Sequence, residues 1–354
     1  MDLRIELAKT LKPKPRDEGA LGFGRIFTDH MFSMDYDEGQ GWHDARIIPY
    51  GPISLDPAAT CLHYGQLVFE GLKAYRTPDG KVVMFRPDQN MQRLNDSNER
   101  LCIPKLDEKD ATEAIAKLVE LEKDWIPRAP GTSLYIRPYV LSTEAFLGVH
   151  PSGSYLFAVI LSPVGPYYKE GLAPIKIYVE DNYVRSVRGG TGFTKCAGNY
   201  AASLRSQVEA EAQGFSQVLW LDGVDRKYVE EVGSMNVFFV VDGEVVTPEL
   251  NGSILSGVTR RSVIQILKDW NIPVSERRIG IDEIAQAYKD GKLQEAFGTG
   301  TAAVISPIGT LRYNGLDMQI NSGEIGEISQ KLYDEISGIQ TGTRKDRYGW
   351  VYEI

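Results

Sequence analysis

The alternation of apolar and polar stretches predicts a β-hairpin early in the chain. Apolar runs at residues 68–75 and 82–85 flank Thr77-Pro78-Asp79-Gly80, and Pro-Asp-Gly is typical of a turn between antiparallel strands. Ahead of this hairpin, the first 45 residues show no sustained period, because glycines interrupt it at Gly22, Gly24, Gly39 and Gly41. We therefore expect irregular structure or short elements there.

Longer periodic stretches predict helices and strands in both halves of the chain. In the first half, we expect helices over 90–102 and 110–125 and buried strands over 133–141 and 155–161. In the second half, we expect strands over 175–179, 218–221, 237–241 and 245–246, and helices over 201–213, over 260–270 and from Asp282 onward. Gly214 suits the position that follows the first of these helices, and Asp282 suits an N-cap.

Prolines and glycines between residues 162 and 171 interrupt helix and strand patterns alike, which predicts a linker. A chain of 354 residues is long enough for two hydrophobic cores. We expect a mixed α and β (α+β) protein with a smaller N-terminal domain over 1–165, a linker over 166–175 and a larger domain over 176–354.

Charge and composition exclude several classes of function. A net charge of −9 argues against nucleic-acid binding, because no basic excess is available to neutralise phosphates. The three cysteines and four histidines are scattered, so neither a disulfide scaffold nor a metal site is expected. No apolar stretch reaches the length of a membrane span or a signal peptide. We expect a cytoplasmic protein of enzyme size that binds no membrane.

The segment Gly189-Gly190-Thr191-Gly192-Phe193-Thr194-Lys195-Cys196-Ala197-Gly198-Asn199-Tyr200 contains the strongest candidate chemistry. Glycines allow the backbone to approach a ligand closely, and a desolvated lysine amine can form a Schiff base. A solvated surface lysine is the commoner interpretation of such a residue. A phosphate-binding loop is a third, but the Gly-Lys-Ser/Thr core is missing, since Thr194 and Cys196 flank Lys195.

Two further segments are suited to an anion, and a third offers an acid. Gly257-Val258-Thr259 precedes a predicted helix, and Gly298-Thr299-Gly300-Thr301-Ala302 is a turn of small residues with free amides and hydroxyls. Together with a Schiff-base lysine they suggest a phosphorylated aldehyde cofactor, which pyridoxal 5'-phosphate (PLP) fits. Glu230-Glu231-Val232-Gly233 offers a carboxylate for the ring nitrogen of such a cofactor, although a solvated acidic turn fits the local sequence as well.

In this order along the chain, the motifs resemble those of the branched-chain amino acid aminotransferases, a PLP-dependent family of fold type IV with a C-terminal pseudo-barrel domain. The resemblance covers most of the chain. Its motifs are Phe27-Thr28-Asp29-His30-Met31, Phe69-Glu70-Gly71, Asn90-Met91-Gln92-Arg93, Leu134-Tyr135-Ile136-Arg137-Pro138, Gly192 to Tyr200, Gln217 to Leu221, Glu231 to Asn236, Gly257 to Arg261 and Phe297 to Ala302.

The resemblance implies a role for each matching residue. Lys195 resembles the catalytic lysine that forms the Schiff base, Glu231 the acid at the pyridine nitrogen, and Tyr200 the partner of the phenolic oxygen. The phosphate group is expected on Arg93, Val258, Thr259 and Thr301. Backbone amides of Thr301 and Ala302 are expected to receive the substrate α-carboxylate, and Arg137 the distal carboxylate of glutamate. The side-chain pocket is expected to have aromatic walls, although each of these residues could be plain core: Phe23, Tyr64, Phe69, Tyr135 and Tyr167.

The activity implied is amino-group exchange between leucine, isoleucine or valine and 2-oxoglutarate, in a homodimer whose ligands are small amino acids and 2-oxo acids. A D-amino acid aminotransferase or an aminodeoxychorismate lyase of the same fold is the alternative, and a non-enzymatic PLP-binding protein is a remoter one. Mammalian members have a redox-active Cys-x-x-Cys where this chain has Ala303 and Ser306, so we expect that thiol switch to be absent.

Overall fold

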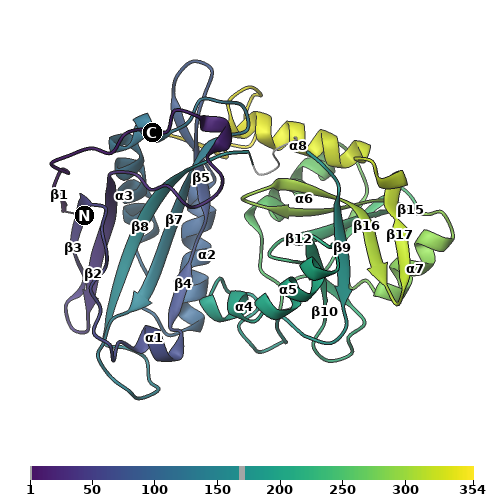
Figure 1. Cartoon of the computed structure of the whole chain (residues 1–354), viewed down its shortest axis with the longest axis horizontal. Helices are drawn as coiled ribbons and strands as arrows, with labels where there is room; N and C mark the ends of the chain where they lie inside the picture. The colour runs from purple at the N-terminus through teal and green to yellow at the C-terminus, as the bar shows by residue number, and fades with distance from the viewer. Residues whose placement is uncertain (1, 167–171) are drawn as a thin grey trace. The chain divides into compact units, whose positions relative to one another are not determined.

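The computed structural model describes residues 2–166 and 172–354, which form two compact units (Figure 1). Unit 1 comprises Met1–Lys169, Thr194–Ala197 and Gly338–Ile354, and unit 2 comprises Glu170–Phe193 and Gly198–Ser337. Each unit contains a nine-stranded sheet, and helices accompany both sheets. The expected mixed α and β class is confirmed, whereas the expected domain boundaries stay a prediction.

The sheet of unit 1 is mainly antiparallel, with strand order β1-β3-β2-β8-β7-β5-β6-β18 and with β4 paired to β7. Its strands are β1 (Leu3–Ile5), β2 (His30–Asp37), β3 (Gly41–Pro49), β4 (Leu67–Phe69), β5 (Leu72–Arg76), β6 (Val82–Phe85), β7 (Ser133–Ser142), β8 (Ser154–Val164) and β18 (Val351–Glu353). Its helices are η1 (Glu18–Ala20), α1 (Thr60–Tyr64), α2 (Pro87–Arg100), α3 (Glu108–Leu121) and η2 (Lys123–Trp125).

Alternation along the strands builds the core of unit 1. Phe32 and Met34 on β2 lie in one cluster with Phe157 on β8, and Leu94 on α2 and Ile115 on α3 belong to the same cluster. Side chains two residues apart on a strand share a face, so α2 and α3 bury this face of the sheet (Figure 1). Full burial of each such side chain stabilises the fold by about 1.5–3 kcal/mol.

The expectation of irregular or short structure in the first 45 residues is confirmed for residues 2–29, where β1 and η1 are both short, and is wrong from His30 onward, because β2 and β3 form a long hairpin there. Gly39, in its turn, and Gly41, the first residue of β3, have positive φ values of 86° and 79°. Glycine accepts this backbone conformation without steric cost, so two of the glycines that interrupt the period in sequence lie where the chain reverses between two strands.

The predicted hairpin at 68–85 is confirmed, with one modification. β5 and β6 are paired antiparallel across the Pro-Asp-Gly turn. The apolar run that was expected to be one strand is divided at Glu70-Gly71 into β4 and β5, both of which pair with β7. This break frees the Glu70 side chain from the sheet pattern, and it is buried beside α2.

Unit 2 has the strand order β11-β10-β9-β16-β15-β12-β13-β14, with β17 paired to β16. Its strands are β9 (Ile175–Glu180), β10 (Gln217–Leu221), β11 (Val229–Val232), β12 (Asn236–Val241), β13 (Glu244–Thr247), β14 (Val274–Glu276), β15 (Leu293–Gly300), β16 (Val304–Tyr313) and β17 (Leu316–Gln319). The remaining helices are α4 (Ala197–Ala201), α5 (Leu204–Ala212), α6 (Val258–Asp269), α7 (Ile281–Lys289), η3 (Ile320–Gly323) and α8 (Glu327–Gln340).

Most of the predicted elements of the second half are confirmed, but two boundaries differ. The helix expected over 201–213 is α5, which begins later, at Leu204, and the short helix α4 precedes it. Gly214 follows α5 with a φ of 85°, as expected of a residue after a helix. The expectation of an Asp282 N-cap is wrong. Gly280 is the N-cap of α7. Asp282 lies in the first turn of this helix, where the positive end of the helix dipole stabilises a carboxylate. Within the described residues, no helix is long and apolar enough to cross a membrane.

Candidate active site

The backbone of Lys195 is held by two elements of unit 1. Its N–H donates to the Ser97 hydroxyl on α2 at 2.9 Å, and its carbonyl accepts from the Phe69 N–H at the end of β4 at 3.0 Å. Cys196, the next residue, forms an isolated β-bridge with Val68. The Lys195 amine lies 4.7 Å from the centroid of the Phe69 ring. A lysine that follows a glycine-rich segment is thus placed on a fixed backbone.

Arg93 forms a buried bidentate ion pair with Glu70. Its Nε and Nη2 lie 2.7 and 2.8 Å from the two oxygens of this carboxylate, which also accepts from Asn90 Nδ2 at 2.7 Å. Burial alone would raise the pKa of Glu70, but the charge and hydrogen bonds of Arg93, with a smaller contribution from the Lys195 ammonium, lower it below its usual value. An ionised Glu70 therefore fixes the plane of the Arg93 guanidinium.

Tyr135 and Arg137 lie two residues apart on β7 and share one face of the sheet. Arg137 Nη2 donates to the Tyr135 hydroxyl at 3.0 Å, and the guanidinium lies 4.7 Å from the Phe69 ring centroid. Phe23 packs edge-on against Tyr135 at 4.8 Å. The Nε atom of Arg137 is one of the few buried side-chain nitrogens among the described residues that have no hydrogen-bond partner. An aromatic wall and an unsatisfied cation therefore lie side by side.

Gly71 is required by the position of Tyr135. A Cβ atom on Gly71 would lie 2.0 Å from the Tyr135 hydroxyl oxygen, far inside van der Waals contact. Glycine at this position is therefore a packing requirement of the aromatic wall.

Two further aromatic residues, Tyr64 and Tyr167, are predicted to line the side-chain pocket. Tyr64, at the end of α1, is 43% exposed, and its hydroxyl donates to the Leu147 carbonyl on the loop between β7 and β8. Tyr167 lies outside the described residues.

In unit 2, the buried Glu231 carboxylate contacts Arg185 and Asn236. Its Oε2 lies 2.5 Å from Nη2 of Arg185, and its Oε1 accepts from Asn236 Nδ2 at 3.2 Å. The same Arg185 nitrogen donates to the carbonyls of Gly192 and Ser253 at 3.1 and 2.6 Å. Arg185 therefore connects the predicted cofactor acid with the glycine-rich segment that precedes Lys195.

The neighbouring Glu230 has a different environment. It is buried, and one of its oxygens is hydrogen-bonded to the Ser253 hydroxyl. Burial raises the pKa of Glu230, and the hydrogen bond from Ser253 and the charge of Arg185 offset this only in part. Of these two carboxylates, Glu231 has the direct ion pair with Arg185.

The predicted phosphate residues of unit 2 lie at the start of α6 and after β15. Val258 and Thr259 are buried in the first turn of α6, whose N-cap is Gly257. The amides of a first helical turn have no partner within the helix and favour an anion. In the described chain, the buried Thr299 hydroxyl has no hydrogen-bond partner. Thr301 and Ala302 follow β15, and Tyr200 lies on α4.

Sequence reasoning missed four residues that contact the predicted site residues, namely Glu70, Gly71, Ser97 and Arg185. Glu70 and Gly71 belonged to a recognised motif but received no role, although a carboxylate inside an apolar run was a signal that it would have a partner. Ser97 and Arg185 gave no local signal, because their partners are distant in sequence.

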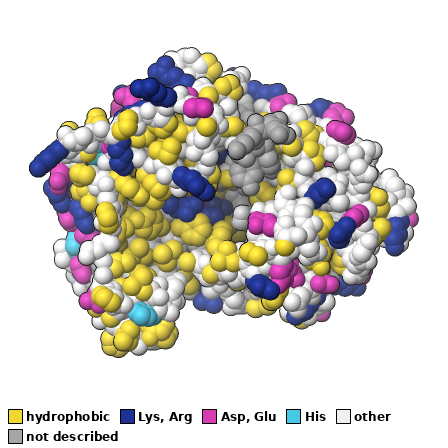
Figure 2. All heavy atoms as spheres, viewed as in Figure 1, with side chains coloured by type: hydrophobic (Ala, Val, Ile, Leu, Met, Phe, Trp, Pro, Cys, Tyr) yellow, Lys and Arg dark blue, Asp and Glu magenta, His cyan; other side chains and the backbone are white. Residues whose placement is uncertain are grey.

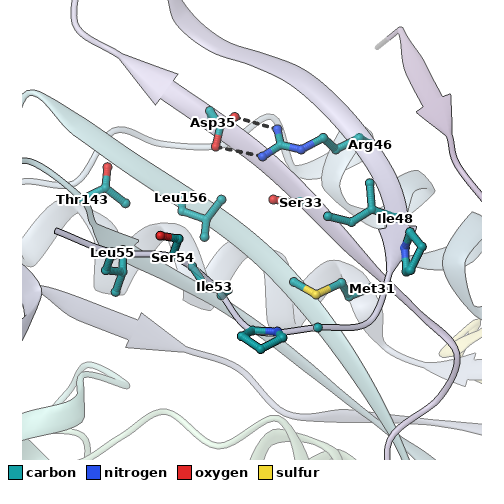
Figure 3. Close-up of a pocket in the computed structure, with 13 residues that line it drawn as sticks. Met31, Ser33, Asp35, Arg46, Ile48, Ile53, Ser54, Leu55, Thr143 and Leu156 are labelled. Atoms are coloured by element: carbon teal, nitrogen blue, oxygen red, sulfur yellow. Dashed lines mark hydrogen bonds and ion pairs between the residues drawn. The ribbon is translucent and has the colours of Figure 1, made fainter.

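The structure places a further pocket elsewhere in unit 1 (Figure 3). It has a volume of about 350 Å³, lies beside β2, β3 and residues 49–55, and has the Asp35–Arg46 ion pair on its wall. None of the residues expected to bind cofactor or substrate lines it, so we do not assign it to the active site. In the described part of the chain, no cluster of three or more potential ligands could hold a metal ion.

Comparison with known proteins identifies the class of enzyme. Residues 67–311 match the family model of amino-transferase class IV. Branched-chain-amino-acid aminotransferase 2 of Bacillus subtilis (strain 168) is 61% identical over 352 residues, covering 99% of this chain and 97% of that protein. A Mycobacterium tuberculosis branched-chain-amino-acid aminotransferase is 49% identical and covers 94% of this chain and 92% of its own length.

Solved structures are similar over nearly the whole chain. A branched-chain amino acid aminotransferase solved as a complex with N-(5'-phosphopyridoxyl)-L-glutamate has a TM-score of 0.72 and 28% identity, covering 90% of this chain and 97% of that one. The Thermoproteus uzoniensis enzyme with norvaline has a TM-score of 0.76 and 26% identity, covering 92% and 99%. Fold and site therefore define an aminotransferase of fold type IV. The chain belongs to the class IV aminotransferases, in the group of the branched-chain-amino-acid aminotransferases.

Proposed function

We propose that this enzyme reversibly transfers the amino group between L-leucine, L-isoleucine or L-valine and 2-oxoglutarate, giving branched-chain 2-oxo acids and L-glutamate. The observation that carries this proposal lies on unit 1. Arg137, whose Nε has no hydrogen-bond partner among the described residues, lies beside the Phe69 ring, and the Lys195 amine contacts the same ring. Such a surface suits an aliphatic side chain and a carboxylate in turn, which is what the two half-reactions require.

The residues present fit PLP as the cofactor. The donor set contains an amine in Lys195, a fixed guanidinium in Arg93 and a buried carboxylate in Glu231. The unpartnered Thr299 hydroxyl and the first-turn amides of α6 add donors of the kind that a phosphate needs. When bound, PLP supplies an aldehyde that condenses with amines and a ring that accepts electrons from the substrate carbon.

The chain's own residues would then have separate tasks. The Lys195 amine would attach the cofactor and later move the proton of the substrate Cα atom as a general base and acid. The Glu231 carboxylate would hold a proton at the pyridine nitrogen, which favours electron acceptance by the ring. Tyr200 would donate to the phenolic oxygen. Arg93, Val258, Thr259 and Thr301 would bind the phosphate group.

Substrate binding would follow the same division. The backbone amides of Thr301 and Ala302 would receive the α-carboxylate. The walls of the side-chain pocket would be Phe23, Tyr64, Phe69, Tyr135 and Tyr167. Arg137, held by the Tyr135 hydroxyl, would receive the distal carboxylate of glutamate or 2-oxoglutarate, and an aliphatic side chain would pack on the aromatic faces instead.

We further propose a cytoplasmic homodimer. Hydrophobic side chains gather over unit 1 on the face seen in Figure 2. On the loop between β7 and β8, Phe146, Leu147 and Val149 are 50, 68 and 84% exposed. Apolar groups this exposed on adjacent positions are typical of an interface. Light scattering should give the mass of two chains, and Leu147→Glu with Val149→Glu should shift it towards one.

The test of the function is a panel of substrates with matched lysine variants. Lys195→Ala should abolish covalent attachment of PLP and transamination, whereas Lys176→Ala, which removes an exposed lysine of β9, should leave both unchanged. L-Leucine, L-isoleucine and L-valine should be used with 2-oxoglutarate, and D-alanine should not. Full activity of Lys195→Ala, or a preference for D-alanine, would contradict the proposal.

A further inference from the structure

The Ser97 hydroxyl is fully buried on α2 and makes two hydrogen bonds. It donates to the Arg93 carbonyl one helical turn earlier at 3.0 Å, and it accepts from the Lys195 N–H at 2.9 Å. A serine hydroxyl has a single proton to donate. Because the Arg93 carbonyl takes that proton, a lone pair is directed to Lys195, and the direction of the second bond is fixed.

The backbone of Lys195 itself is held by contacts separate from those of the glycine-rich turns before it. Those turns, residues 189–193, have partners of their own, since Arg185 Nη2 donates to the Gly192 carbonyl and Asn199 Nδ2 donates to the Thr191 carbonyl. In unit 1, the Phe69 N–H fixes the Lys195 carbonyl, and Ser97 fixes the N–H. Two bonds from two different elements thus hold the peptide groups on both sides of the Lys195 Cα atom, from which the lysine side chain extends.

From this arrangement we propose that Ser97 is a positioning residue for Lys195: it holds the backbone of the lysine so that its amine is presented to the cofactor aldehyde. The inference rests on the proposed function of Lys195. It makes α2 a common platform, since Arg93 and Ser97 are one turn apart on one face of the helix. Arg93 would bind the cofactor phosphate, and Ser97 would fix the backbone from which the Lys195 side chain extends.

The alternative is a purely helical role. Serine within a helix commonly donates to the carbonyl four residues earlier, and removal of such a bond changes helix stability slightly. In that case the effect of Ser97→Ala would pass through α2 and Arg93 to the phosphate. The two roles therefore differ in whether the effect requires the lysine side chain.

A double-mutant cycle separates the two roles. Wild type, Ser97→Ala, Lys195→Ala and the double variant are prepared without cofactor and titrated with PLP. Noncovalent binding is measured by equilibrium dialysis, and covalent attachment is measured by borohydride reduction and mass spectrometry of the Lys195 peptide. Ser206→Ala, which removes a buried serine hydroxyl of α5 that has no hydrogen-bond partner among the described residues, is the control for loss of a buried hydroxyl as such.

We expect Ser97→Ala to slow covalent attachment about 10- to 100-fold, as expected for a reacting group displaced by about 1 Å. In the Lys195→Ala background it should leave the dissociation constant of PLP unchanged within about twofold, since the hydroxyl acts only on the lysine. Ser206→Ala should behave like wild type. If Ser97→Ala does not fold, Ser97→Cys keeps the volume but accepts hydrogen bonds weakly, and the same slowing is expected.

Two results would overturn the inference. An equal loss of PLP affinity with and without the lysine side chain would assign Ser97 to the helix and to Arg93. Covalent attachment of PLP to Lys195 at the wild-type rate in both Ser97→Ala and Ser97→Cys would show that Ser97 does not position Lys195. Failure of the proposed function is distinguishable, because it would appear as absent attachment to Lys195 in the wild type itself.

Discussion

Replacement of Gly71 by alanine tests whether the aromatic wall is as tightly packed as the structure indicates. The new Cβ would lie 2.0 Å from the Tyr135 hydroxyl oxygen and 2.9 Å from Cζ. Carbon and oxygen atoms need more than about 3 Å, so the phenol ring would have to move by about 1 Å. That movement would break the 3.0 Å hydrogen bond between Arg137 and the Tyr135 hydroxyl.

Gly71→Ala should lower both the unfolding free energy and kcat/KM, through two separate effects. Overpacking of a buried site costs about 1–3 kcal/mol of unfolding free energy. Loss of a hydrogen bond that involves a charged group costs about 1.5–3 kcal/mol, which corresponds to roughly a 10- to 150-fold lower kcat/KM for the acidic cosubstrate if Arg137 receives its carboxylate. The branched-chain 2-oxo acids do not need that carboxylate contact, and their kcat/KM should fall by less.

The assay is a comparison of Gly71→Ala in the wild-type and Tyr135→Phe backgrounds. Urea unfolding gives the stability, and kcat/KM for 2-oxoglutarate and for 4-methyl-2-oxopentanoate gives the specificity. Tyr135→Phe removes the closest atom, so the alanine should cost at least about 0.5 kcal/mol less there. An equal cost in both backgrounds, or equal losses for the two oxo acids, would refute this account of Gly71.

The remaining predictions concern charged groups. The pKa of Glu70 is lower in the folded state, so the Arg93–Glu70 pair stabilises the protein fully above the unfolded pKa of about 4.3. This stabilisation is lost as the pH falls through the folded pKa. In urea unfolding between pH 6 and 3, the unfolding free energy of Glu70→Gln should therefore fall less than that of the wild type. Glu70→Ala should lower the unfolding free energy by about 3–5 kcal/mol at pH 7 in the same assay, because it removes the carboxylate that forms the bidentate ion pair with the buried Arg93. Arg137→Gln should raise KM for 2-oxoglutarate at least about tenfold and alter KM for the branched-chain substrates little, as steady-state kinetics would show. Asp222 accepts hydrogen bonds from four backbone N–H groups, so Asp222→Ala should lower the unfolding free energy by about 2 kcal/mol while the folded enzyme keeps its kcat.

The sequence was sufficient for the elements whose stability is local. The hairpin of β5 and β6, the long strands β7 and β8 and the helices α2, α3 and α6 all follow from periodicity and turn residues. The resemblance of several motifs in one order along most of the chain was sufficient to indicate the family, whereas the residues around Lys195 alone left a surface lysine and a phosphate-binding loop open as interpretations. Periodicity failed from His30 to residue 45, where Gly39 and Gly41 interrupt it at the reversal between two long strands.

Only the tertiary structure decided which groups hold the chemical residues in place. Glu70 pairs with Arg93, Ser97 meets the N–H of Lys195 from 98 positions away, and Gly71 leaves room for the Tyr135 hydroxyl. Each of these contacts joins segments that have no local preference for one another. Local sequence determines the type of element and the chemistry of a side chain, but the partner of a buried polar group is chosen when strands and helices pack, because burial leaves such a group few donors and acceptors within reach.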